Sequence, residues 1–468
     1  MATTYLSRTP SSTTNRKTFT ISAWVKRANI SVSDKAIFSG GSDANVSGFY
    51  TIKFDDNDKL RVQYYDDATY NIRTNRVFRD VSAWYHIVVA NDTTQGTASN
   101  RTKIYINGVQ ETDVVNASGS TADYPNINFD YNVNNDSVQQ VGANRNSSAS
   151  VVNYFDGEMA HFHLTDGTAY DASAFGETDA TTGIWKPKTA PSVTYGTNGF
   201  FLKFENSGAF GTDSSGNSNN FTVNGTMTQN IDTPSNVFNV LNAVSNPPNG
   251  YTLSNGNLEA TVSGSSFVRT FITNTIAPTS GKWYWESKLI TSGGTDRSSI
   301  GICSYDENIG TGTTIPQNEL SICTGFSRIR FTENGSTTEV DSFYTVPSAN
   351  DIFMYALDLD NTKFYFGVNG NWWNYNSSET GGDPTSGSGY VTNSTNIIKS
   401  AMSAFLRVQA GAVSTTFTNQ FNFGNGYFGT TAVSSAQNPD DGIGIFEYDV
   451  PTGYRALCTK SINAQEYD

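Results

Sequence analysis

Apolar and polar residues alternate along most of this chain with the two-residue period of a β-strand. In residues 18–27, TFTISAWVKR, the apolar Phe19, Ile21 and Val25 alternate with Thr, Ser and Trp, which is typical of a strand with one buried face. Similar runs occupy residues 49–54, 60–65, 84–90 and 102–107. Short strands that follow one another without helical periodicity between them predict a β-sandwich or barrel.

The second half of the chain shows the same period in different residues. Its strand-like runs are 267–274, 282–290, 298–305, 352–360, 362–368 and 415–423. Residues 396–408, NIIKSAMSAFLRV, form the one apolar run that is long enough for a helix, but we prefer a strand there. The expected fold class is therefore all-β throughout, with two jelly-roll-like β-sandwich domains in tandem.

Two stretches interrupt the alternation and divide the chain. Residues 165–199 contain two prolines and no period, which predicts a long surface loop with one short helix at 172–175. Residues 231–250 contain three prolines and several asparagines, the composition of a linker. We therefore predict one domain at 1–230, a linker at 231–250 and a second domain at 251–468.

Composition and charge narrow the classes of partner. Charged residues make up only 15% of the chain, while 24 Tyr, 29 Phe and 41 Gly favour strands and turns over helices. The formal charge of −14 argues against binding to nucleic acid or to a membrane surface. No apolar run is long enough to span a membrane, the N-terminus lacks the apolar core of a signal peptide, and three scattered cysteines indicate free thiols made in a reducing cytosol.

Two stretches far apart in the sequence share one hairpin pattern. TKIYINGV at 102–109 and TKFYFGVNGN at 362–371 both combine a Thr-Lys start, an alternating apolar run and an Asn-Gly pair. Asn-Gly favours the tight turn of a β-hairpin because positive φ costs these residues little. No fixed period repeats between the two stretches, so we interpret them as two domains that use the same hairpin and not as a duplication.

Several motifs of the first half resemble the laminin G-like branch of the concanavalin A-like lectin/glucanase superfamily. They are YLSRT, FTISAWVKR, WYHIVVAND (84–92), TKIYINGV, FDGEMAHFHLTDG (155–167) and DSSGN (213–217). The resemblance spans about 5–230. DSSGN usually lies near the start of such domains, and its late position here indicates a permuted sandwich.

The second half resembles a SPRY domain. The motifs are SGKWYWESKL (280–289), SSIGIC (298–303), YALDLDNTKFYFGVNGNW (355–372) and FNFGNGYF (421–428). The ending GIGIFEYDVPTGYRALCTKSI (442–462) resembles the tail of SPRY domains of bacteriophage structural proteins. The resemblance implies a virion protein that is made in the host cytoplasm, carried on the released particle, present as a homo-oligomer or in several copies, and in contact with other virion proteins.

Catalytic and metal-binding patterns are weak. A retaining glucanase on this fold needs two carboxylates on one strand. The nearest candidates are better explained as a turn residue, Asp156, with a solvent-facing Glu158, and as the end of a strand before a turn, Asp358 with Asp360. We therefore expect no enzymatic activity and no catalytic residues. GNGYFG at 424–429 has no following helix to receive a nucleotide.

Metal binding has two candidate sets. His161 and His163 are spaced to share a strand face, but His86 is the only other histidine and no third ligand is identifiable. For calcium, which some laminin G-like domains bind, the acidic turn 55–58 is followed by Lys59 where an oxygen ligand would fall, and Asp213 is a weaker candidate. We expect no cofactor and no metal, with calcium as the alternative left open.

Aromatic residues in polar loops are the remaining site candidates, because sugar rings pack on them while hydroxyls bind neighbouring amides. Residues 369–382 carry Asn371, Trp372, Trp373 and Tyr375. Of these we expect Trp373 and Tyr375 to be exposed, since the position of Trp372 often packs into SPRY domains. Residues 64–71 offer Tyr65 and Tyr70 in the first domain.

Together these features predict a non-catalytic tail-fibre or spike protein that binds host surface polysaccharide through loop aromatics. The alternative is an architectural protein that decorates the capsid or tail without binding a receptor, and a polysaccharide-degrading enzyme is third.

Overall fold

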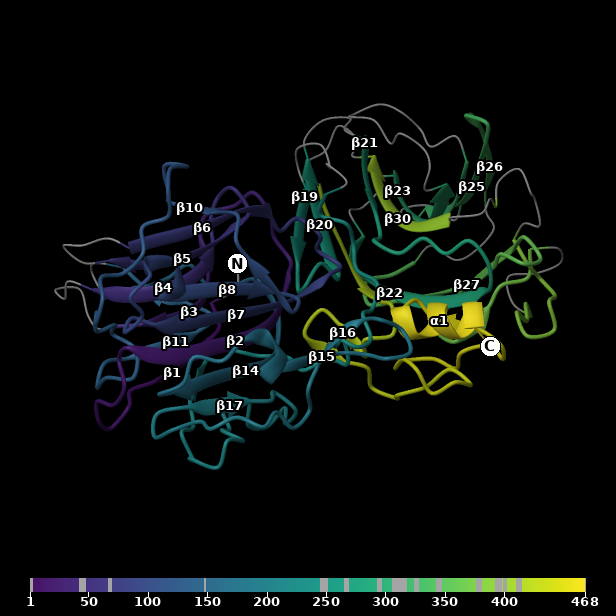
Figure 1. The fold of residues 1–468 in the computed structure, drawn as a ribbon. Coiled ribbons are helices and arrows are strands. Elements are labelled where there is room, and N and C mark those ends of the chain that lie inside the picture. Colours follow the sequence, from purple (N-terminus) through teal and green to yellow (C-terminus); the bar gives the residue numbers. More distant parts are fainter. Residues whose placement is uncertain are drawn as a thin grey trace. The chain divides into compact units, whose positions relative to one another are not determined.

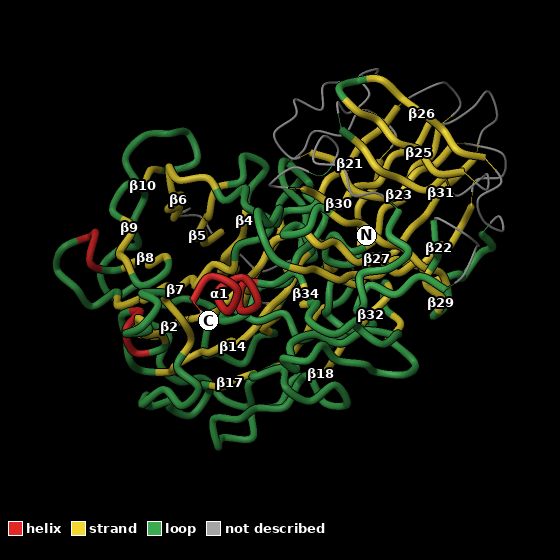
Figure 2. The backbone as a smooth tube through the Cα atoms, turned by 90° about the vertical axis from the view of Figure 1, so that its right-hand side faces the viewer, coloured by secondary structure: helices red, strands yellow, loops and turns green. Residues whose placement is uncertain are grey.

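The computed structural model describes the chain over the following residues: 3–41, 48–65, 70–146, 149–244, 251–264, 269–292, 297–304, 318–323, 328–341, 347–375, 381–391, 398, 402–409 and 415–467. Strands and loops make up nearly all of this part of the chain, with very little helix, as Figure 2 shows. The prediction of an all-β protein built from β-sandwiches is confirmed. No helix in the described ranges has the length and apolar character needed to cross a bilayer.

The chain divides into two compact units, coloured purple to teal and teal to yellow in Figure 1. The first unit comprises Met1–Gln229 with Thr233–Ser235, and the second comprises Asn230–Asp232 with Asn236–Asp468. Each unit has its own hydrophobic core.

The first unit is a sandwich of two antiparallel sheets. The larger sheet runs, in spatial order, β10 (Val114–Val115), β6 (Tyr70–Val77), β5 (Lys59–Tyr65), β4 (Phe49–Phe54), β3 (Lys35–Gly40), β11 (Gln139–Val141), β1 (Tyr5–Arg8) and β18 (Thr222–Asn224). The smaller sheet runs β17 (Phe200–Leu202), β14 (Gly157–Asp166), β2 (Thr18–Arg27), β7 (Trp84–Asp92), β8 (Thr102–Ile106) and β9 (Val109–Glu111). The first strand β1 lies beside the late strand β18, so the beginning and end of this unit meet in one sheet.

Alternation explains the core of the first unit. Phe19, Ile21 and Val25 on β2 are almost fully buried and face side chains of the larger sheet such as Phe38 and Ile52. Because side chains on a strand point alternately to its two faces, the intervening residues lie on the outward faces of the sheets. These outward faces position the candidate sites described below.

Residues 167–199, hereafter the strap, are more ordered than the predicted surface loop. They contain the short 3-10 helix η2 (Ala172–Ala174) at the predicted place and a small hairpin of β15 (Gly176–Thr178) and β16 (Trp185–Pro187). Phe175 of the strap is buried against Val88 on the outward face of the smaller sheet. The strap therefore covers a sheet face and is partly core.

Short elements complete the first unit. They are the 3-10 helix η1 (Ala98–Asn100), which precedes β8, and the two-stranded pair β12 (Asn144–Arg145) and β13 (Val151–Val152), which contacts β3.

The second unit also has two antiparallel sheets. One runs β19 (Tyr251–Ser254), β20 (Glu259–Gly264), β31 (Thr415–Asn422), β22 (Lys282–Ser292), β27 (Ile352–Asp358), β28 (Lys363–Val368) and β29 (Asn371–Trp372), with β34 (Arg455–Ala456) paired to β22. The other runs β21 (Arg269–Thr273), β30 (Met402–Gln409), β23 (Arg297–Ser304), β24 (Glu319–Cys323), β25 (Arg328–Glu333) and β26 (Ser336–Asp341). The strand preferred at 396–408 is present as β30, while most of its first six residues lie outside the described ranges.

The end of the chain covers the outward face of the first of these sheets. Phe446 and Tyr454 are buried against Tyr284 and Met354 on that face. A small pair, β32 (Tyr427–Phe428) with β33 (Thr431–Ala432), precedes this segment, and the helix α1 (Thr459–Tyr467) follows it. We did not predict α1, because its residues TKSINAQEY lack an apolar helical stripe.

The predicted linker 231–250 needs correction over its first half. Phe238, Val240 and Leu241 are nearly inaccessible and belong to the core clusters of the second unit. The backbone N–H of Asn239 donates to the carbonyl of Leu457, so this stretch is fixed to the end of the chain. The prolines and asparagines around these three apolar residues led to the linker prediction, although the three residues pack into a core. Residues 245–250 lie outside the described ranges.

Both Asn-Gly pairs form the predicted hairpin turns. Asn107 and Gly108 have φ of 48° and 86°, and Asn369 and Gly370 have 50° and 84°. Positive φ at both central residues is the conformation that Asn-Gly adopts at low cost. The shared pattern of the two stretches is thus a shared turn.

Candidate functional site

The structure reverses the expectation for the two adjacent tryptophans. Trp373 is 7% exposed, its ring lies edge-on to Phe366 at a centroid distance of 4.3 Å, and its backbone N–H donates to the carbonyl of Phe366. The prediction that Trp373 is an exposed ligand-binding residue is wrong. The tight turn at 369–370 sets the hairpin register so that Trp373 faces the core and Trp372 the other side.

The other residues of this hairpin are more accessible. Trp372 is half-buried with its ring 6.2 Å from that of Tyr284, and Asn371 is exposed. Tyr375 is half-buried and packs against Phe331 of the second unit's core, so it offers only part of its ring. Residues 376–380 of the predicted loop lie outside the described ranges. Asn371 and Trp372 are the candidates that survive here.

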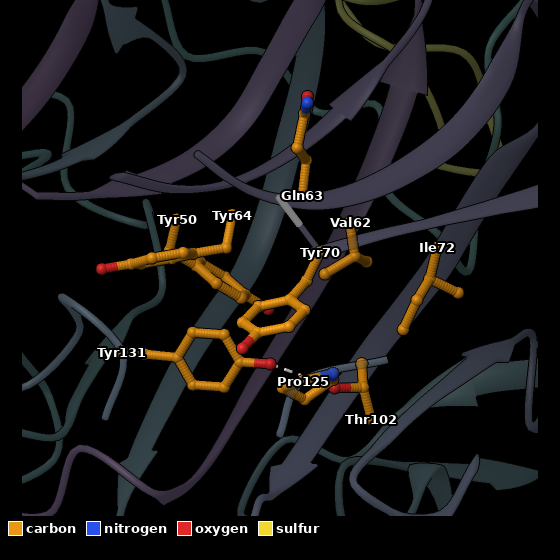
Figure 3. Close-up of a pocket in the computed structure, with 9 residues that line it drawn as sticks. All are labelled: Tyr50, Val62, Gln63, Tyr64, Tyr70, Ile72, Thr102, Pro125 and Tyr131. Carbon is orange, nitrogen blue, oxygen red and sulfur yellow. Dashed lines mark hydrogen bonds between the residues drawn. The ribbon is translucent and has the colours of Figure 1, made fainter. Parts of the chain in front are cut away.

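In the first unit Tyr70 points into the sandwich and not to solvent. It is 8% exposed and lines a cavity of ≈ 10 Å³ together with Tyr50, Tyr64 and Tyr131 (Figure 3). The buried Tyr70 hydroxyl has no hydrogen-bond partner among the described residues. A cavity of this size holds at most about one water molecule, so Tyr70 is wrong as a glycan-binding residue.

Tyr65 is the exposed aromatic residue of the predicted pair. Its side chain is 42% exposed and stacks on Phe49 with a centroid distance of 4.9 Å and an interplanar angle of 21°. The two residues are direct partners across β4 and β5, on the face of the larger sheet that points away from the core. They form an aromatic platform at one end of that face.

A row of polar side chains crosses the larger sheet beside this platform. On β4 and β5 the row lies two residues along the strand from Phe49 and Tyr65. The register pairs Asn71 with Gln63, Gln63 with Thr51, Thr51 with Ser39 and Ser39 with Gln140. Because partners in register share a face, all five side chains lie on the outward face of the sheet. Figure 3 shows Gln63 pointing away from the interior tyrosines. We call these five residues the polar row.

Basic residues follow on the other side of the polar row. The Arg61 Nε–H donates to Asn71 Oδ1 over 3.1 Å, which holds both side chains against the sheet. Lys53 is paired with Asp34, and Arg73 lies 3.5 Å from Asp55. The outward face therefore changes from aromatic through uncharged polar to basic along the strands.

The polar row has unused hydrogen-bonding capacity. In the described part of the chain, Gln63 Oε1, Thr51 Oγ1 and Gln140 Nε2 are buried without a hydrogen-bond partner. Buried polar atoms are normally paired, so unpaired ones in a row indicate places for water or for a ligand. The five side chains of the polar row are nearly inaccessible, from 0% exposed for Thr51 to 5% for Ser39, so a ligand hydroxyl would reach these atoms only if a side chain turned outward.

The candidate metal ligands of the first unit have other roles. Asp58 is fully buried and bonds to Arg27 and Arg79. Asp55 accepts from the backbone of Asn57 and Lys59, which forms the hairpin turn. Among the described residues, no group of three His, Cys, Asp or Glu is arranged to hold a metal ion.

The late acidic motif and the candidate carboxylates Asp358 and Asp360 also belong to turns, whereas Glu158 lies within β14. Asp213 accepts hydrogen bonds from Phe201, Ser215 and Asn219, so both of its oxygens are used within its loop. Asp358 accepts from the backbone and side chain of Asn361, and Asp360 from the backbone of Gly281. These carboxylates fix turns between strands.

Sequence reasoning found Tyr65 but missed its partner Phe49 and the polar row. The alternation identified which residues of each strand face outward, as in KLRVQYY at 59–65. It did not give the pairing between strands, because register depends on turns and bulges such as the one between Lys59 and Arg61. Five polar residues on five strands become one row only when that register is known.

Comparisons with known proteins agree with the fold of the first unit. Residues 2–173 match the family model described as the concanavalin A-like lectin/glucanases superfamily. This part of the chain has a laminin G-like, concanavalin A-like lectin fold. No curated protein matches the chain in sequence.

Solved structures that resemble parts of the chain include SPRY and laminin G-like domains. The SPRY domain of human HERC1 is 13% identical, with 36% of this chain and 91% of that chain covered and a TM-score of 0.27. Domains LG4-5 of the mouse laminin alpha1 chain are 9% identical, with coverages of 90% and 85% and a TM-score of 0.27. Domain 4 of an arabinanase from Geobacillus stearothermophilus, solved with arabinotriose, is 16% identical, with coverages of 34% and 64% and a TM-score of 0.24.

Proposed function

We propose that the protein is a non-catalytic glycan-binding protein, and that its first unit binds a polysaccharide on the outward face of the larger sheet. One observation carries this proposal: the stacked pair Phe49 and Tyr65 lies directly beside the polar row on the same face. Aromatic rings accept the C–H faces of sugars, while amides and hydroxyls bond to sugar hydroxyls. Tyr65 offers the first kind of contact directly, and the polar row, which is at most 5% exposed, would offer the second when its side chains turn outward.

The direction of the polar row suits a linear chain of sugars. It runs across the strands, whose spacing in a sheet is about 4.7–4.9 Å, close to the length of one sugar residue. An oligosaccharide lying across the strands would meet Asn71, Gln63 and Thr51 in turn. Each such contact is weak, so affinity would come from several sugars bound at once.

A second surface is the hairpin end of the second unit. Asn371 is exposed and Trp372 keeps part of its ring accessible there. We place it second because Trp372 stands without a stacked partner on the accessible side and no polar row accompanies it in the described residues. It serves as the competing site in the experiment below.

The biological setting that we propose is a bacteriophage tail fibre or spike, in which the protein attaches the particle to host polysaccharide. The support is the resemblance of residues 442–462 to SPRY domains of phage structural proteins. Several copies on one particle would raise the effective affinity well beyond that of a single site. Mass spectrometry of purified particles tests this setting, and a decoration protein would be present there without binding cells.

The binding proposal is tested on the full-length protein with a panel of neutral and acidic oligosaccharides. We expect Tyr65→Ala to weaken binding about fivefold, because it removes a stacking contact of about 1 kcal/mol. Tyr70→Phe is the matched control, since Tyr70 lies in the interior, and it should bind as the unchanged protein does. Loss of binding in Trp372→Ala but not in Tyr65→Ala would move the site to the second unit. Release of reducing ends would show an enzyme.

A further inference from the structure

The strap covers a face on which all three histidines of the chain gather. His86 on β7, and His161 and His163 on β14, lie on the outward face of the smaller sheet. The His161 and His163 rings are 6.3 Å apart, and His86 stacks on Trp24 at 4.6 Å. His86 and His163 are almost fully buried, although histidine is charged in water at mildly acid pH.

The hydrogen bonds of His86 fix its protonation state. The Trp185 Nε1–H of the strap donates to His86 Nδ1 over 3.0 Å. An indole nitrogen is a donor only, so Nδ1 must carry no proton. Nε2 then carries the proton and donates to Ser22 Oγ at 2.9 Å. A second proton on Nδ1 would set two N–H groups against each other, so the contact with the strap exists only with neutral His86.

A second contact joins the strap to the cluster nearby. The Tyr195 hydroxyl lies 2.9 Å from His163 Nδ1, and the His163 ring stacks on Phe201 at 3.9 Å. This pair tolerates either direction of the hydrogen bond. Its enclosure by Phe201 and Phe175, however, leaves a charged imidazole without water.

The surroundings offer little compensation for a charge on His86. The titratable and charged groups on this face, element by element, are Lys26 on β2, Lys103 and Tyr105 on β8, Glu158, His161 and His163 on β14, Lys203 and Glu205 after β17, and Tyr170, Asp171, Glu177, Lys186 and Tyr195 on the strap. Lys186 is paired with Asp179 of the strap itself. Burial, and then the neighbouring His161, lower the pKa of His86 to about 3. Burial also lowers the pKa values of His161 and His163.

We propose that the strap is an acid-sensitive latch, held closed by the bond from Trp185 to neutral His86 and released when His86 takes up a proton. Opening would uncover an aromatic face that is otherwise sealed: Trp24 is 2% and Phe175 1% exposed with the strap in place. The latch lies on the sheet opposite the proposed glycan face and does not depend on glycan binding.

Proton linkage sets the size and sign of the effect. Closed His86 stays neutral, whereas a solvated histidine has a pKa of about 6.5. The closed state is therefore fully stabilised above about pH 6.5 and loses stability as the pH falls from there towards 3. For one histidine the ratio of open to closed strap rises about tenfold per pH unit in that window, or roughly 100-fold at pH 4.5.

Hydrogen exchange of the full-length protein tests the latch. The Tyr170 N–H of the strap, which donates to Thr20 Oγ1 on β2, should lose protection about 50-fold between pH 6.5 and 4.5 after correction for intrinsic exchange. Amides of β5 in the other sheet serve as the internal control and should keep theirs. Unchanged protection of the strap over this range would overturn the proposal, as would an equal loss in both sheets.

The variant His86→Gln separates the latch from general acid unfolding. The side-chain oxygen of the introduced glutamine can still accept from Trp185 but does not titrate. The tenfold rise in the ratio of open to closed strap per pH unit should therefore be lost in this variant. If the variant keeps the full dependence, the latch is not at His86. Should it fail to fold, selective ¹⁵N-histidine labelling of the unchanged protein decides, because only three histidines give signals. A proton on Nδ1 of closed His86 would contradict the proposal.

Discussion

Glu286 shows how the surroundings of one residue control a whole segment. This carboxylate on β22 accepts from the backbone N–H of Glu447 and Tyr448, from the Tyr284 hydroxyl and from Asn422 Nδ2. Burial raises its pKa to about 7, and the four donors act in the opposite direction. The segment near the end of the chain is thereby bonded to the sheet that it covers.

The substitution Glu286→Gln should destabilise the second unit. Its amide nitrogen would face an N–H donor where an oxygen accepted, which costs about 1–3 kcal/mol for a buried group. Urea unfolding followed by exchange of peptides from β22 and β27 measures the effect. Glu466→Gln on the exposed face of α1 is the control and should change little. A Glu286→Gln protein as stable as the control would show that the bonds to residues 447 and 448 are not important.

At the scale of elements, the two Asn-Gly hairpins do more than reverse the chain. A Cβ added to Gly108 would lie 3.0 Å from the Trp185 ring, and one added to Gly370 would lie 3.2 Å from the Tyr448 ring. Each turn thus makes room for an aromatic residue of the segment that covers its sheet. The TKIYINGV hairpin therefore also holds the strap in place.

Replacing Gly108 or Gly370 with alanine should therefore lower the free energy of unfolding by more than backbone strain alone. Gly119 has a φ of 83° with no atom near its added Cβ, so Gly119→Ala measures the strain alone, about 1–2 kcal/mol. Gly108→Ala should exceed it and also increase exchange in the strap, because Trp185 must move. In the second unit, Gly453→Ala is the matched control for Gly370→Ala. Equal losses for Gly108→Ala and Gly119→Ala would mean that the contact with Trp185 contributes nothing.

Elements with a clean two-residue period could be predicted from the sequence, whereas the segments that cover them could not. KWYWESKLI at 282–290 alternates and forms β22, but Phe238 and Phe175 are isolated apolar residues in polar, proline-containing stretches. Their burial depends on distant sheet faces that no local pattern describes. For the same reason Trp372 and Trp373 were assigned the wrong way round, since one residue of register decides which tryptophan is buried.

At the scale of the whole molecule, the two units should respond to acid in opposite directions. His86 stabilises the first unit above about pH 6.5 and loses this contribution as the pH falls, because its pKa in the folded state is lowered. Glu286 has a raised pKa, so the folded second unit binds a proton more tightly than the unfolded chain does. Its contribution is therefore greatest below about pH 4.5 and is lost as the pH rises to 7.

Acidification from pH 7 to 5 should thus lower the free energy of strap opening in the first unit and raise the opening free energy of the second unit. Each change is on the order of 2 kcal/mol, since one pH unit corresponds to about 1.4 kcal/mol per proton. Exchange of peptides from the strap and from β22 follows the two units separately in one sample. His86→Gln and Glu286→Gln should each remove the slope of their own unit only. Parallel slopes in both units would contradict this prediction.

The central claim, that the outward face of the larger sheet binds glycan, is tested most directly by a crystal structure. The full-length protein would be crystallised with the oligosaccharide of the panel that it binds most tightly. We expect a sugar ring packed on Tyr65 and Phe49, with hydroxyls bonded to Gln63 and Thr51. A sugar bound at Trp372, or on any other face, with the Tyr65 platform empty, would contradict the claim.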